Sequence, residues 1–577
     1  MERFPQWTRT LFGPAETSPV ILEIDLDRGI LSAAPTDPLA AYRSINTPSL
    51  RALRDGLREA AADVRVRGLI ITLGTAPLSA TQTDELGDMI EEFGASRPTV
   101  AFAPGFGEFA NGVWPYRLAA RAREVWMQPS GLLSLSGVHL SITLLRGGLE
   151  KLGIEPEYAQ RKEYKSMGEQ MAGREVSAAN REMMTRLGQS MMDDTVALIA
   201  RRRSLEPDAV WAAVNASPLT AEQAHQQGFV DRVGYRDEVY TELRARWSVA
   251  RRPDGTGLRF VHRYTTHGPL RLLSQLSERN RPSIGVVTLQ GDIVAGRGSS
   301  GGIGRQQSGS AVVCDQLRAA AGDEAVKALV LRVDSPGGSA LASDEIWREV
   351  HQLATAKPVV ASMGDVAASG GYYVSMGATE IVANPSTLTG SIGVVAGKFV
   401  TAGLYDKLGL IREGINVGAR AGMLTGDAPF TTDEWAVLDR MLDDIYRDFT
   451  TKAARDRSMS ADDLEPLARG RVWTGSDAAD RGLVDHLGGM STAIERACAL
   501  AEVDRAEVHL RAIPTVPLLA RFRPADSSES PNALRMTTAT PLEAMATITT
   551  TGDPVQSLLT ALGAPGVLSL PWNIRIG

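Results

Sequence analysis

Short runs of apolar, mostly β-branched residues alternate along most of the chain with longer segments that mix apolar and polar positions. In the second half, the apolar runs predict strands at 283–289, 328–333, 358–362 and 380–383. The segments between them predict helices at 312–320, 343–355 and 370–376, the middle one with apolar residues at helical spacing. Because strands and helices alternate in this way in βαβ units, we expect an α/β fold with parallel sheet.

The second half of the chain repeats the first. Four segments of the first half have a counterpart in the second at an offset of 254 to 260 residues. They are 68–73 with 328–333, 124–138 with 380–394, 151–153 with 407–409, and 220–231 with 474–485. Four matches in the same order at a nearly constant offset indicate two homologous domains in tandem.

The repeat and the composition of the remaining segments predict four parts. These are an N-terminal repeat at 17–245, an arginine-rich linker at 246–281, a C-terminal repeat at 282–512 and an extension at 513–577. The extension has no counterpart in the first half, and its many threonines and prolines predict a loosely ordered segment. Within the first repeat, methionines at near-helical spacing in 181–203 predict a core or an oligomer interface rather than a substrate cradle.

Composition excludes several classes of protein. Of the 577 residues, 43% are hydrophobic and 22% are charged, which rules out disorder over most of the chain. The formal net charge of −7 argues against nucleic acid as the main partner, because phosphate binding needs a basic face. Cys314 and Cys498 are too few for a disulfide framework, so we expect two buried thiols.

Neither a metal, a cofactor nor a membrane span is expected. The chain has no H-E-x-x-H motif and no Cys/His cluster that could ligate a metal ion. The first thirty residues lack the apolar region of a signal peptide. No run approaches the ~20 apolar residues of a spanning helix.

A serine at a predicted strand-to-helix turn is the strongest local signal for chemistry. Ser369 lies among small residues in Met363-Gly-Asp-Val-Ala-Ala-Ser-Gly-Gly-Tyr-Tyr373. Backbone N–H groups at the start of the following helix can stabilise a developing oxyanion. Taken alone, the segment fits an ordinary Gly-Ser turn equally well.

A second signal follows the predicted strand 328–333. In Asp334-Ser-Pro-Gly-Gly-Ser339, two glycines after a proline let the backbone approach a ligand closely. The N–H of Gly338 is therefore a candidate oxyanion donor. An ordinary turn again explains the segment equally well by itself.

A nucleophilic serine needs a base. His486 and His509 are the only histidines after Ser369, and His486, like His351 in the predicted helix 343–355, is interpreted as structural. Lysine is the next candidate, because burial can lower its pKa until the neutral amine is available.

Comparison of the two halves selects the lysine. Ser369 aligns with Val113, and Gly337-Gly338 aligns with Pro77-Leu78, so the first half lacks the nucleophile and the glycine pair. Lys165 aligns with Ala421, so the second half lacks this lysine, which alone would be taken for a solvated loop residue. Each half has kept what the other lost, as expected if one site takes its base from the first half and its nucleophile from the second.

Five motifs stand in order along the chain. They are Tyr164-Lys-Ser166, Asp334-Ser-Pro-Gly-Gly338, Gly364-Asp-Val-Ala-Ala-Ser-Gly-Gly-Tyr-Tyr373, Thr389-Gly-Ser-Ile-Gly-Val394 and Gly470-Arg-Val-Trp-Thr-Gly475. Together they resemble the signal peptide peptidase A family in its long tandem form, also called protease IV. The resemblance extends over residues 20–510, and each motif also resembles the wider ClpP/crotonase superfamily.

The resemblance implies two ClpP/crotonase-like domains in tandem, each a βαβ-rich core with a protruding helical arm. It implies a serine endopeptidase with a Ser/Lys dyad that degrades signal peptides after their release. Ser369 would be the nucleophile and Lys165 the general base. Ser391 would orient the lysine amine, and Gly338 and Gly370 would supply oxyanion N–H groups.

The resemblance also implies partners and a location. The substrates would be signal-peptide remnants and other apolar, extended peptides, and the enzyme would form a ring-like or bowl-shaped homo-oligomer, for which a tetramer is one option. Members of the family associate with the cytoplasmic membrane. Since no N-terminal anchor is recognised here, peripheral membrane contact and a cytoplasmic location both stay open.

Two other functions stay open on the sequence. A crotonase-type acyl-CoA enzyme would need an acidic acid/base residue and would leave the division of Ser369 and Lys165 between the halves unexplained. A non-catalytic membrane quality-control scaffold would tolerate loss of either residue. The motif Gly296-Arg-Gly-Ser-Ser-Gly301 matches a dinucleotide fingerprint, but the loop continues past its third glycine, so we expect a flap near the cleft.

Overall fold

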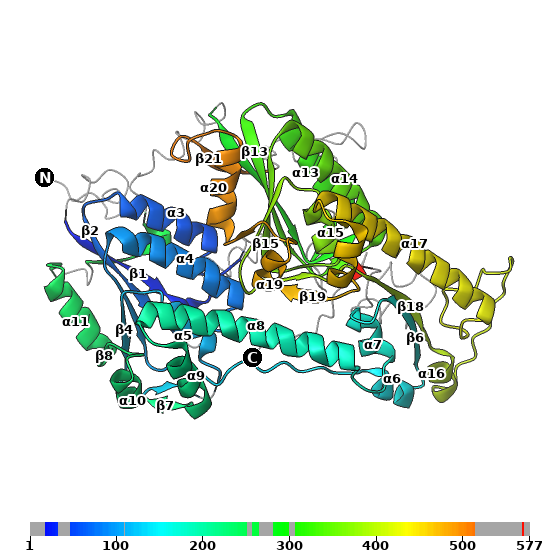
Figure 1. Cartoon of the computed structure of the whole chain (residues 1–577), viewed down its shortest axis with the longest axis horizontal. Coiled ribbons are helices and arrows are strands. Elements are labelled where there is room, and N and C mark those ends of the chain that lie inside the picture. Colours follow the sequence, from blue (N-terminus) through cyan, green and yellow to red (C-terminus); the bar gives the residue numbers. More distant parts are fainter. Residues whose placement is uncertain are drawn as a thin grey trace, which may run out of the picture. The chain divides into compact units, whose positions relative to one another are not determined.

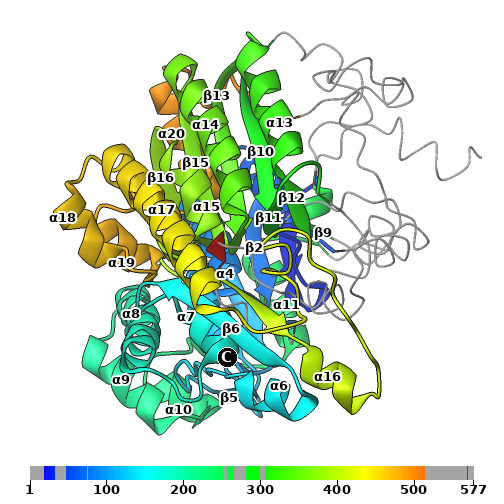
Figure 2. The ribbon, with the colours of Figure 1, turned by 90° about the vertical axis from the view of Figure 1, so that its right-hand side faces the viewer.

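The computed structural model describes residues 18–32, 47–74, 76–108, 110–250, 257–264, 281–298, 306–513 and 568–569 (Figures 1 and 2). Most of the predicted extension and parts of the predicted linker and Gly-rich loop lie outside these residues. The chain divides into two compact units. The first combines Met1–Val138 with Met191–Arg281, and the second combines His139–Ser190 with Pro282–Ile576.

The first unit is built on a parallel sheet with strand order β8-β4-β3-β2-β1-β9. Its strands are β1 (Val20–Asp25), β2 (Val66–Thr72), β3 (Thr99–Ala103), β4 (Glu124–Met127), β8 (Arg232–Val233) and β9 (Leu258–Phe260). Its main helices are α3 (Leu50–Ala61), α4 (Ala80–Ser96), α5 (Val113–Ala119), α9 (Pro207–Ala216), α10 (Ala221–Gln226) and α11 (Arg236–Arg246). Val239 and Leu243 of α11 pack in one cluster with Ile70 and Phe102, so α11 covers one face of this sheet.

The second unit is built on a larger sheet with the path β19-β17-β15-β13-β10-β21, to which β16 and β20 add beside β15. Its strands are β10 (Ser283–Gln290), β13 (Val326–Ser335), β15 (Val359–Ala368), β16 (Glu380–Ala383), β17 (Leu388–Gly390), β19 (Val472–Thr474), β20 (His486–Leu487) and β21 (His509–Ala512). All neighbours are parallel except β17 and β19. The strands predicted at 283–289, 328–333, 358–362 and 380–383 are confirmed.

Helices cover both faces of this sheet, which explains why its strands are apolar on both sides. Ala328 and Val330 of β13 pack against α20 (Met490–Leu500), whereas Leu329, Leu331 and Val333 belong to the larger core on the other face. That core is covered by α13 (Ser310–Gly322), α14 (Ala340–Ala356), α15 (Gly370–Met376) and α17 (Thr432–Asp456). Figure 1 shows α20 on one side of β13 and α13 and α14 on the other.

The tandem α/β class expected from the sequence is confirmed by equivalent elements in the two halves. N-cap serines start α4 and α14 at Ser79 and Ser339, and N-cap threonines start α10 and α19 (Gly475–Asp480) at Thr220 and Thr474. The long helix α8 (Ala178–Arg203) corresponds to α17 in the same way. The methionines of α8 are buried, as expected of core positions.

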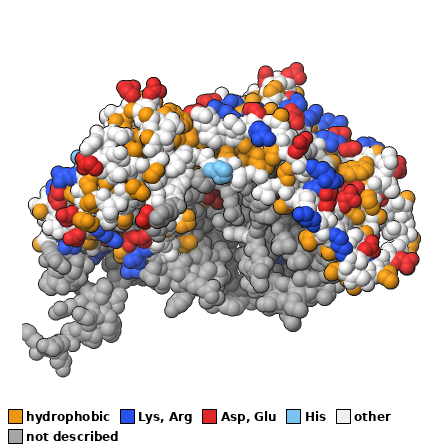
Figure 3. Space-filling model, turned by 90° about the horizontal axis from the view of Figure 1, so that it is seen from below, with side chains coloured by type: hydrophobic (Ala, Val, Ile, Leu, Met, Phe, Trp, Pro, Cys, Tyr) orange, Lys and Arg blue, Asp and Glu red, His pale blue; other side chains and the backbone are white. Residues whose placement is uncertain are grey.

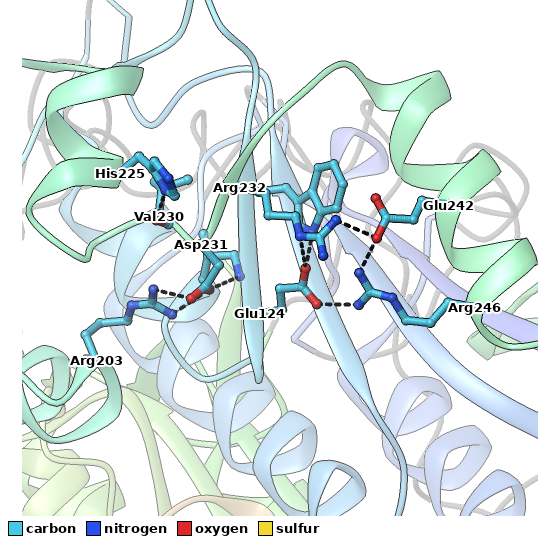
Figure 4. Close-up of polar contacts among 10 residues, drawn as sticks. Glu124, Arg203, His225, Val230, Asp231, Arg232, Glu242 and Arg246 are labelled. Carbon is cyan, nitrogen blue, oxygen red and sulfur yellow. Dashed lines mark hydrogen bonds and ion pairs between the residues drawn. The ribbon is translucent and has the colours of Figure 1, made fainter.

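A network of ion pairs holds β4, which lies between β8 and β3 in the first sheet (Figure 4). Asp231 accepts the backbone N–H of Val125 at 2.7 Å and binds Arg203 of α8 through two hydrogen bonds of 2.8 Å. Glu124 binds Arg246 of α11 at 2.6 Å. The strand is therefore tied to the two helices that flank it.

The second half repeats this network. Asp485 takes the place of Asp231 on Ile381 and Arg457, and Glu380 takes the place of Glu124 on Arg496. His486 lies where the first half has Arg232 and approaches Glu380 at 3.3 Å. This contact fits the structural role predicted for His486 from the repeat. The ring of His351 stacks on Trp347, which fits the structural role predicted for that histidine.

A two-stranded antiparallel sheet explains why the units do not coincide with the sequence halves. Strand β6 (Glu155–Arg161) comes from the first half and pairs along its whole length with β18 (Val394–Val400) of the second. Residues 139–190, including α6 (Arg146–Leu152) and α7 (Ser166–Ala172), thus belong to the second unit. The residues that follow β6 come from the first half of the sequence. The pairing of β6 with β18 brings them into the unit formed by the second half.

Three further features concern the cysteines, the apolar character of the helices and the charged surface. Cys314 and Cys498 are buried thiols, as expected. In the described part of the chain, no helix combines the length and the apolar composition needed to cross a bilayer. Figure 3 shows acidic and basic side chains interspersed with apolar ones over the face that it draws.

The buried ion pair between Asp84 and Arg117 generates a stability prediction. Arg117 donates to Asp84 at 2.7 and 3.0 Å, and both side chains are almost fully buried. Asp84→Ala leaves the guanidinium without its carboxylate and should lower the free energy of unfolding by ~3–5 kcal/mol in urea titrations followed by circular dichroism. Glu222→Ala, which removes an exposed contact to Gln226, should cost less than ~0.5 kcal/mol. Equal losses in the two variants would contradict the prediction.

Candidate active site

Ser369 lies at the turn between β15 and α15. Its φ of 54° and ψ of −112° are rare for a residue with a side chain. Its backbone N–H donates to the carbonyl of Gly390, and its carbonyl accepts from the N–H of Tyr373, both at 2.8 Å. The turn is therefore fixed from two sides, and the Ser369 side chain is fully buried.

The backbones of Gly370 and Gly338 adjoin at this turn. A Cβ added to Gly370 would come within 2.7 Å of Ser343 Oγ and 3.2 Å of the backbone N of Gly338. A Cβ on Gly338, whose φ is 155°, would come within 2.1 Å of the carbonyl oxygen of Ile293. Only glycine allows this close approach of β14 (Gly337–Gly338) to the start of α15.

Ser335 shapes the turn that leads into β14. Its hydroxyl donates to the carbonyl of Gly291 at 2.6 Å and accepts from the N–H of Gly337 at 3.1 Å. The side chain is fully buried. It therefore orients the peptide that precedes Gly338. No role for this serine was predicted from the sequence, although it stands within the Asp334–Gly338 motif.

Lys165 reaches the serine from the chain segment that follows β6. Its Nζ lies 2.7 Å from Ser369 Oγ, 3.0 Å from Ser391 Oγ and 3.1 Å from the carbonyl oxygen of Ser391. The whole side chain is buried. Desolvation disfavours the charged ammonium and lowers the pKa of Lys165 well below its ordinary value.

The three contacts fit the neutral amine. A neutral Nζ has two N–H bonds and one lone pair, whereas an ammonium has three N–H bonds. The oxygens of Ser391 can accept both N–H groups, which leaves the lone pair directed to the hydroxyl of Ser369. In this arrangement Ser369 donates its proton toward Lys165, the direction needed to activate an alcohol.

Ser391 itself is held in an unusual conformation. Its φ is 52°, and its N–H donates to the carbonyl of Arg471 at 2.7 Å. Because the carbonyl and the hydroxyl of Ser391 both face Nζ, this one residue determines where the two N–H groups of the amine point.

The segment 469–471 packs against the backbone of Tyr164 and Lys165. The carbonyl of Arg469 accepts the N–H of Tyr164 at 3.2 Å, and Gly470 donates to the carbonyl of Ile392 at 2.8 Å. Gly470 has a φ of 80°, and a Cβ there would come within 2.5 Å of the backbone N of Lys165. This glycine begins the Gly470–Gly475 motif, but no role for it was predicted from the sequence.

A charged network anchors the helix that carries Ser369. The hydroxyl of Tyr373 in α15 lies 2.7 Å from a carboxylate oxygen of Asp448 and 3.0 Å from one of Asp344, so it can donate to either. Lys452 binds the same two carboxylates at 2.8 and 2.6 Å. The network joins α15 to α14 and α17, so the position of the nucleophile turn depends on the packing of three helices.

The structure brings together all five residues selected from the sequence. Ser369, Lys165 and Ser391 form one hydrogen-bonded group, and Gly338 and Gly370 adjoin it. Among the described residues, no group of three or more His, Cys, Asp or Glu side chains is arranged to hold a metal ion. The dinucleotide motif lies partly outside the described residues, and the next helix, α13, begins only at Ser310.

Comparison with protein families agrees with this geometry. The model of peptidase family S49 matches residues 110–250 and 351–504. The chain belongs to peptidase family S49. The two matched regions lie in the two sequence halves, and the prediction of a serine peptidase family is confirmed.

Individual S49 relatives resemble the chain over most of its length. The "Serine protease SPPA, chloroplastic" of Arabidopsis thaliana is 34% identical over 77% of this chain and 65% of its own length. "Protease 4" of Haemophilus influenzae is 29% identical over 76% of this chain and 71% of its own. "Protease 4" of Salmonella typhi is 28% identical over 79% and 72%. The alignment with the chloroplast protein thus spans less than two thirds of that relative.

A solved ClpP1 mutant from Listeria monocytogenes aligns with 38% of this chain at 13% identity and a TM-score of 0.25. At that score, the likeness supports no conclusion about this S49 chain.

Gly470 provides a test of how strictly Lys165 must be placed. Gly470→Ala should push the backbone of Lys165 away from Ser391 and lower kcat for a peptide substrate by about 100-fold, as a misplacement near 1 Å can. Gly482→Ala is the matched control, since Gly482 has a φ of 73° but only the terminal methyl of Met459 nearby. Both variants should lose ~1 kcal/mol of stability from the left-handed backbone. Loss of stability without loss of kcat in Gly470→Ala would contradict this role.

Proposed function

We propose that the chain is a serine endopeptidase that uses Ser369 as nucleophile and Lys165 as general base. The 2.7 Å approach of Lys165 Nζ to Ser369 Oγ in a fully buried position carries the proposal. Desolvation lowers the pKa of Lys165 and so favours the neutral amine, and the two oxygens of Ser391 can accept its N–H groups, which leaves the lone pair for the serine. The first repeat contributes the base and the second contributes the nucleophile.

The reaction follows from these positions. Ser369 Oγ attacks the scissile carbonyl carbon while its proton passes to Lys165 Nζ, and the N–H groups of Gly338 and Gly370 stabilise the oxyanion. The Lys165 ammonium then donates its proton to the leaving amine as the C–N bond breaks. Water attacks the acyl-enzyme by the same route, its proton passing to Lys165, and Ser369 regains a proton as the acid product leaves.

We propose apolar, extended peptides, including remnants of signal peptides, as substrates. The S49 relatives named "Serine protease SPPA" and "Protease 4" support peptides as substrates, and the apolar, extended kind is proposed on the family resemblance of the motifs. The crotonase-type alternative loses its support with the family assignment, and the preserved hydrogen-bonded group of Ser369 and Lys165 argues against a non-catalytic scaffold. On the basis of the family resemblance, we also propose that the chain forms a homo-oligomer, with a tetramer as one option.

We propose peripheral contact with the cytoplasmic membrane. Between α16 (Ala402–Lys407) and α17, Ile411, Ile415 and Val417 are 99%, 89% and 91% exposed. Large apolar side chains concentrated in one exposed segment mark an interaction surface. This segment supports the proposal.

Pelleting with vesicles tests the membrane proposal. Ile411→Asp combined with Ile415→Asp should abolish co-sedimentation with vesicles of phosphatidylethanolamine and phosphatidylglycerol, because charge opposes insertion of the segment. Val64→Asp, at an apolar residue that is 77% exposed elsewhere, should bind as the parent chain does. Unchanged binding by the double variant would remove the support that the segment gives.

Substitution of the two proposed catalytic residues tests the reaction. Ser369→Ala and Lys165→Ala should each lower kcat/KM for an apolar peptide ester by several orders of magnitude, because each removes a member of a unit that acts together. Lys162→Ala is the matched control, since Lys162 is half exposed and lies 3.8 Å from Glu465. A serine-directed phosphonate should label Ser369 in the parent chain. Turnover by Ser369→Ala at the parent rate would refute the assignment.

The pH dependence of the rate tests the base. Protonated Lys165 cannot accept the serine proton, so activity should rise with pH through one deprotonation whose midpoint lies below the ordinary lysine value of ~10.4. Ser391→Ala should reduce the rate without abolishing it, because the carbonyl of residue 391 still accepts one N–H. A profile that titrates near ~6.5 and survives Lys165→Ala would show that a histidine is the base.

A further inference from the structure

Arg471 lies between two aromatic rings beside the candidate active site. The Cζ atom of its guanidinium is 4.8 Å from the ring centre of Tyr164 and 4.3 Å from the ring centre of Trp473 in β19. The same guanidinium binds Glu182 of α8 at 2.7 Å. Because a guanidinium is planar and can stack on rings while it pairs with a carboxylate, it holds all three partners in a fixed arrangement.

This arginine contacts both sides of the proposed base. Tyr164, on which its guanidinium stacks, immediately precedes Lys165 in the chain. The carbonyl oxygen of Arg471 accepts the N–H of Ser391 at 2.7 Å. Ser391 in turn presents its carbonyl and hydroxyl oxygens to Lys165 Nζ. One residue therefore restrains both the segment that carries the amine and the residue that orients it.

Helix α8 supports the segment that contains Arg471, and Figure 1 shows β19 and α19 beside this helix. Glu182, Arg186 and Ser190 are spaced four residues apart and therefore lie on one face of α8. Three further contacts join the helix to the second half: Arg186 with Asp477 at 2.6 Å, Met183 Sδ with the N–H of Val472 at 3.3 Å, and Ser190 Oγ with Thr474 Oγ1 at 2.6 Å. Arg471 is where this docking of β19 on α8 reaches the neighbours of the base.

Arg481 offers a comparison on the same ring. Its Cζ atom lies 4.2 Å from the ring centre of Trp473, and its guanidinium binds Asp477 at 3.0 Å. Its contacts hold β19 and α19 together, whereas those of Arg471 also reach Tyr164 and Ser391. The two arginines therefore separate support of β19 from support of the base.

We propose that Arg471 is a positioning residue for Lys165, because its stacked guanidinium and its carbonyl hold Tyr164 and Ser391 where the oxygens of Ser391 can accept the N–H groups of the amine. The inference rests on the proposed function, since it assigns Arg471 to the base of that reaction. Loss of the stack would loosen both neighbours of the amine and admit water beside Nζ. The amine would then be protonated more readily, and its lone pair would be directed less strictly to Ser369.

The charges around the amine decide which variants are needed. Helix α15 and residues 388–397 carry no charged side chain. The segments on either side of Lys165 and the segment opposite it contribute Lys162, Glu163, Glu169, Arg469 and Arg471. Glu163 pairs with Arg469 at 2.8 Å, and Glu169 binds Ser177 at 2.6 Å. Loss of the positive charge of Arg471 would by itself favour the ammonium, so a variant that keeps this charge is also required.

The rate at which a serine-directed fluorophosphonate labels Ser369 across a series of pH values tests the inference in the full-length chain. Arg471→Met removes the planar cation and should raise the midpoint of the profile by about one pH unit and lower its alkaline plateau about tenfold. Arg471→Lys keeps the charge but cannot stack as a plane between two rings, so its midpoint should rise as well. Arg481→Met is the matched control and should keep the parent midpoint and plateau.

Each other result contradicts the inference. A parent profile in folded Arg471→Met would overturn it, as would a parent midpoint in Arg471→Lys, which would assign any effect in Arg471→Met to charge alone. Arg471→Lys also decides the question if Arg471→Met does not fold by circular dichroism. An equal shift in Arg481→Met would show that the base responds to any loosening of β19. Labelling of Lys165→Ala at the parent rate would instead refute the proposed function, whatever the variants of Arg471 show.

Combination with Ser391→Ala tests the route by which Arg471 acts. If the arginine works by holding the oxygens of Ser391 at the amine, part of its effect is already lost in Ser391→Ala. The plateau labelling rate of Arg471→Met with Ser391→Ala should then lie within about twofold of the slower single variant. Losses that multiply in the double variant would show two independent effects and overturn the proposed route.

Discussion

The burial of one amine beside one hydroxyl is the constraint on which the proposed chemistry depends. Lys165 Nζ hydrogen-bonds to oxygens of Ser369 and Ser391, and desolvation lowers its pKa. Because the pKa of Lys165 is lower in the folded chain, the unfolded chain binds more protons at this amine. The amine therefore opposes folding at pH values below its unfolded pKa of ~10.4. This destabilisation decreases as the pH rises toward that value. The surrounding packing must offset that cost.

Backbone strain is present at the same site. Ser369 and Ser391 both have positive φ, and Gly338 and Gly470 stand where a Cβ would collide with main-chain atoms. These conformations persist because parallel strands, helix starts and the segment 469–471 determine them together. The duplicated fold supplies the same scaffold twice, but only the second unit carries this arrangement.

One strand at the site has neighbours on both edges. Strand β14 carries the proposed oxyanion donor Gly338, and its edge opposite β11 (Asp292–Val294) pairs with another backbone segment. That segment is β22 (Leu568–Ser569), which lies outside both repeats. A strand of two glycines can adjoin both neighbours because it has no side chains to obstruct either.

The sequence by itself determined the α/β class and the tandem repeat, because periodicity and internal duplication are properties of residue order. The complementary losses in the two halves singled out Ser369 and Lys165 as candidates, and the family motifs added Ser391, Gly338 and Gly370. Only the tertiary structure decided how Lys165 meets Ser369: β6 leaves its own half and pairs with β18, and such long-range pairing has no local signal. The roles of Ser335 and Gly470, and the place of β22, also depend on contacts between distant segments. The threonine- and proline-rich composition predicted a loosely ordered extension. No local pattern in it predicts that two of its residues pair with β14, because that pairing depends on a distant strand.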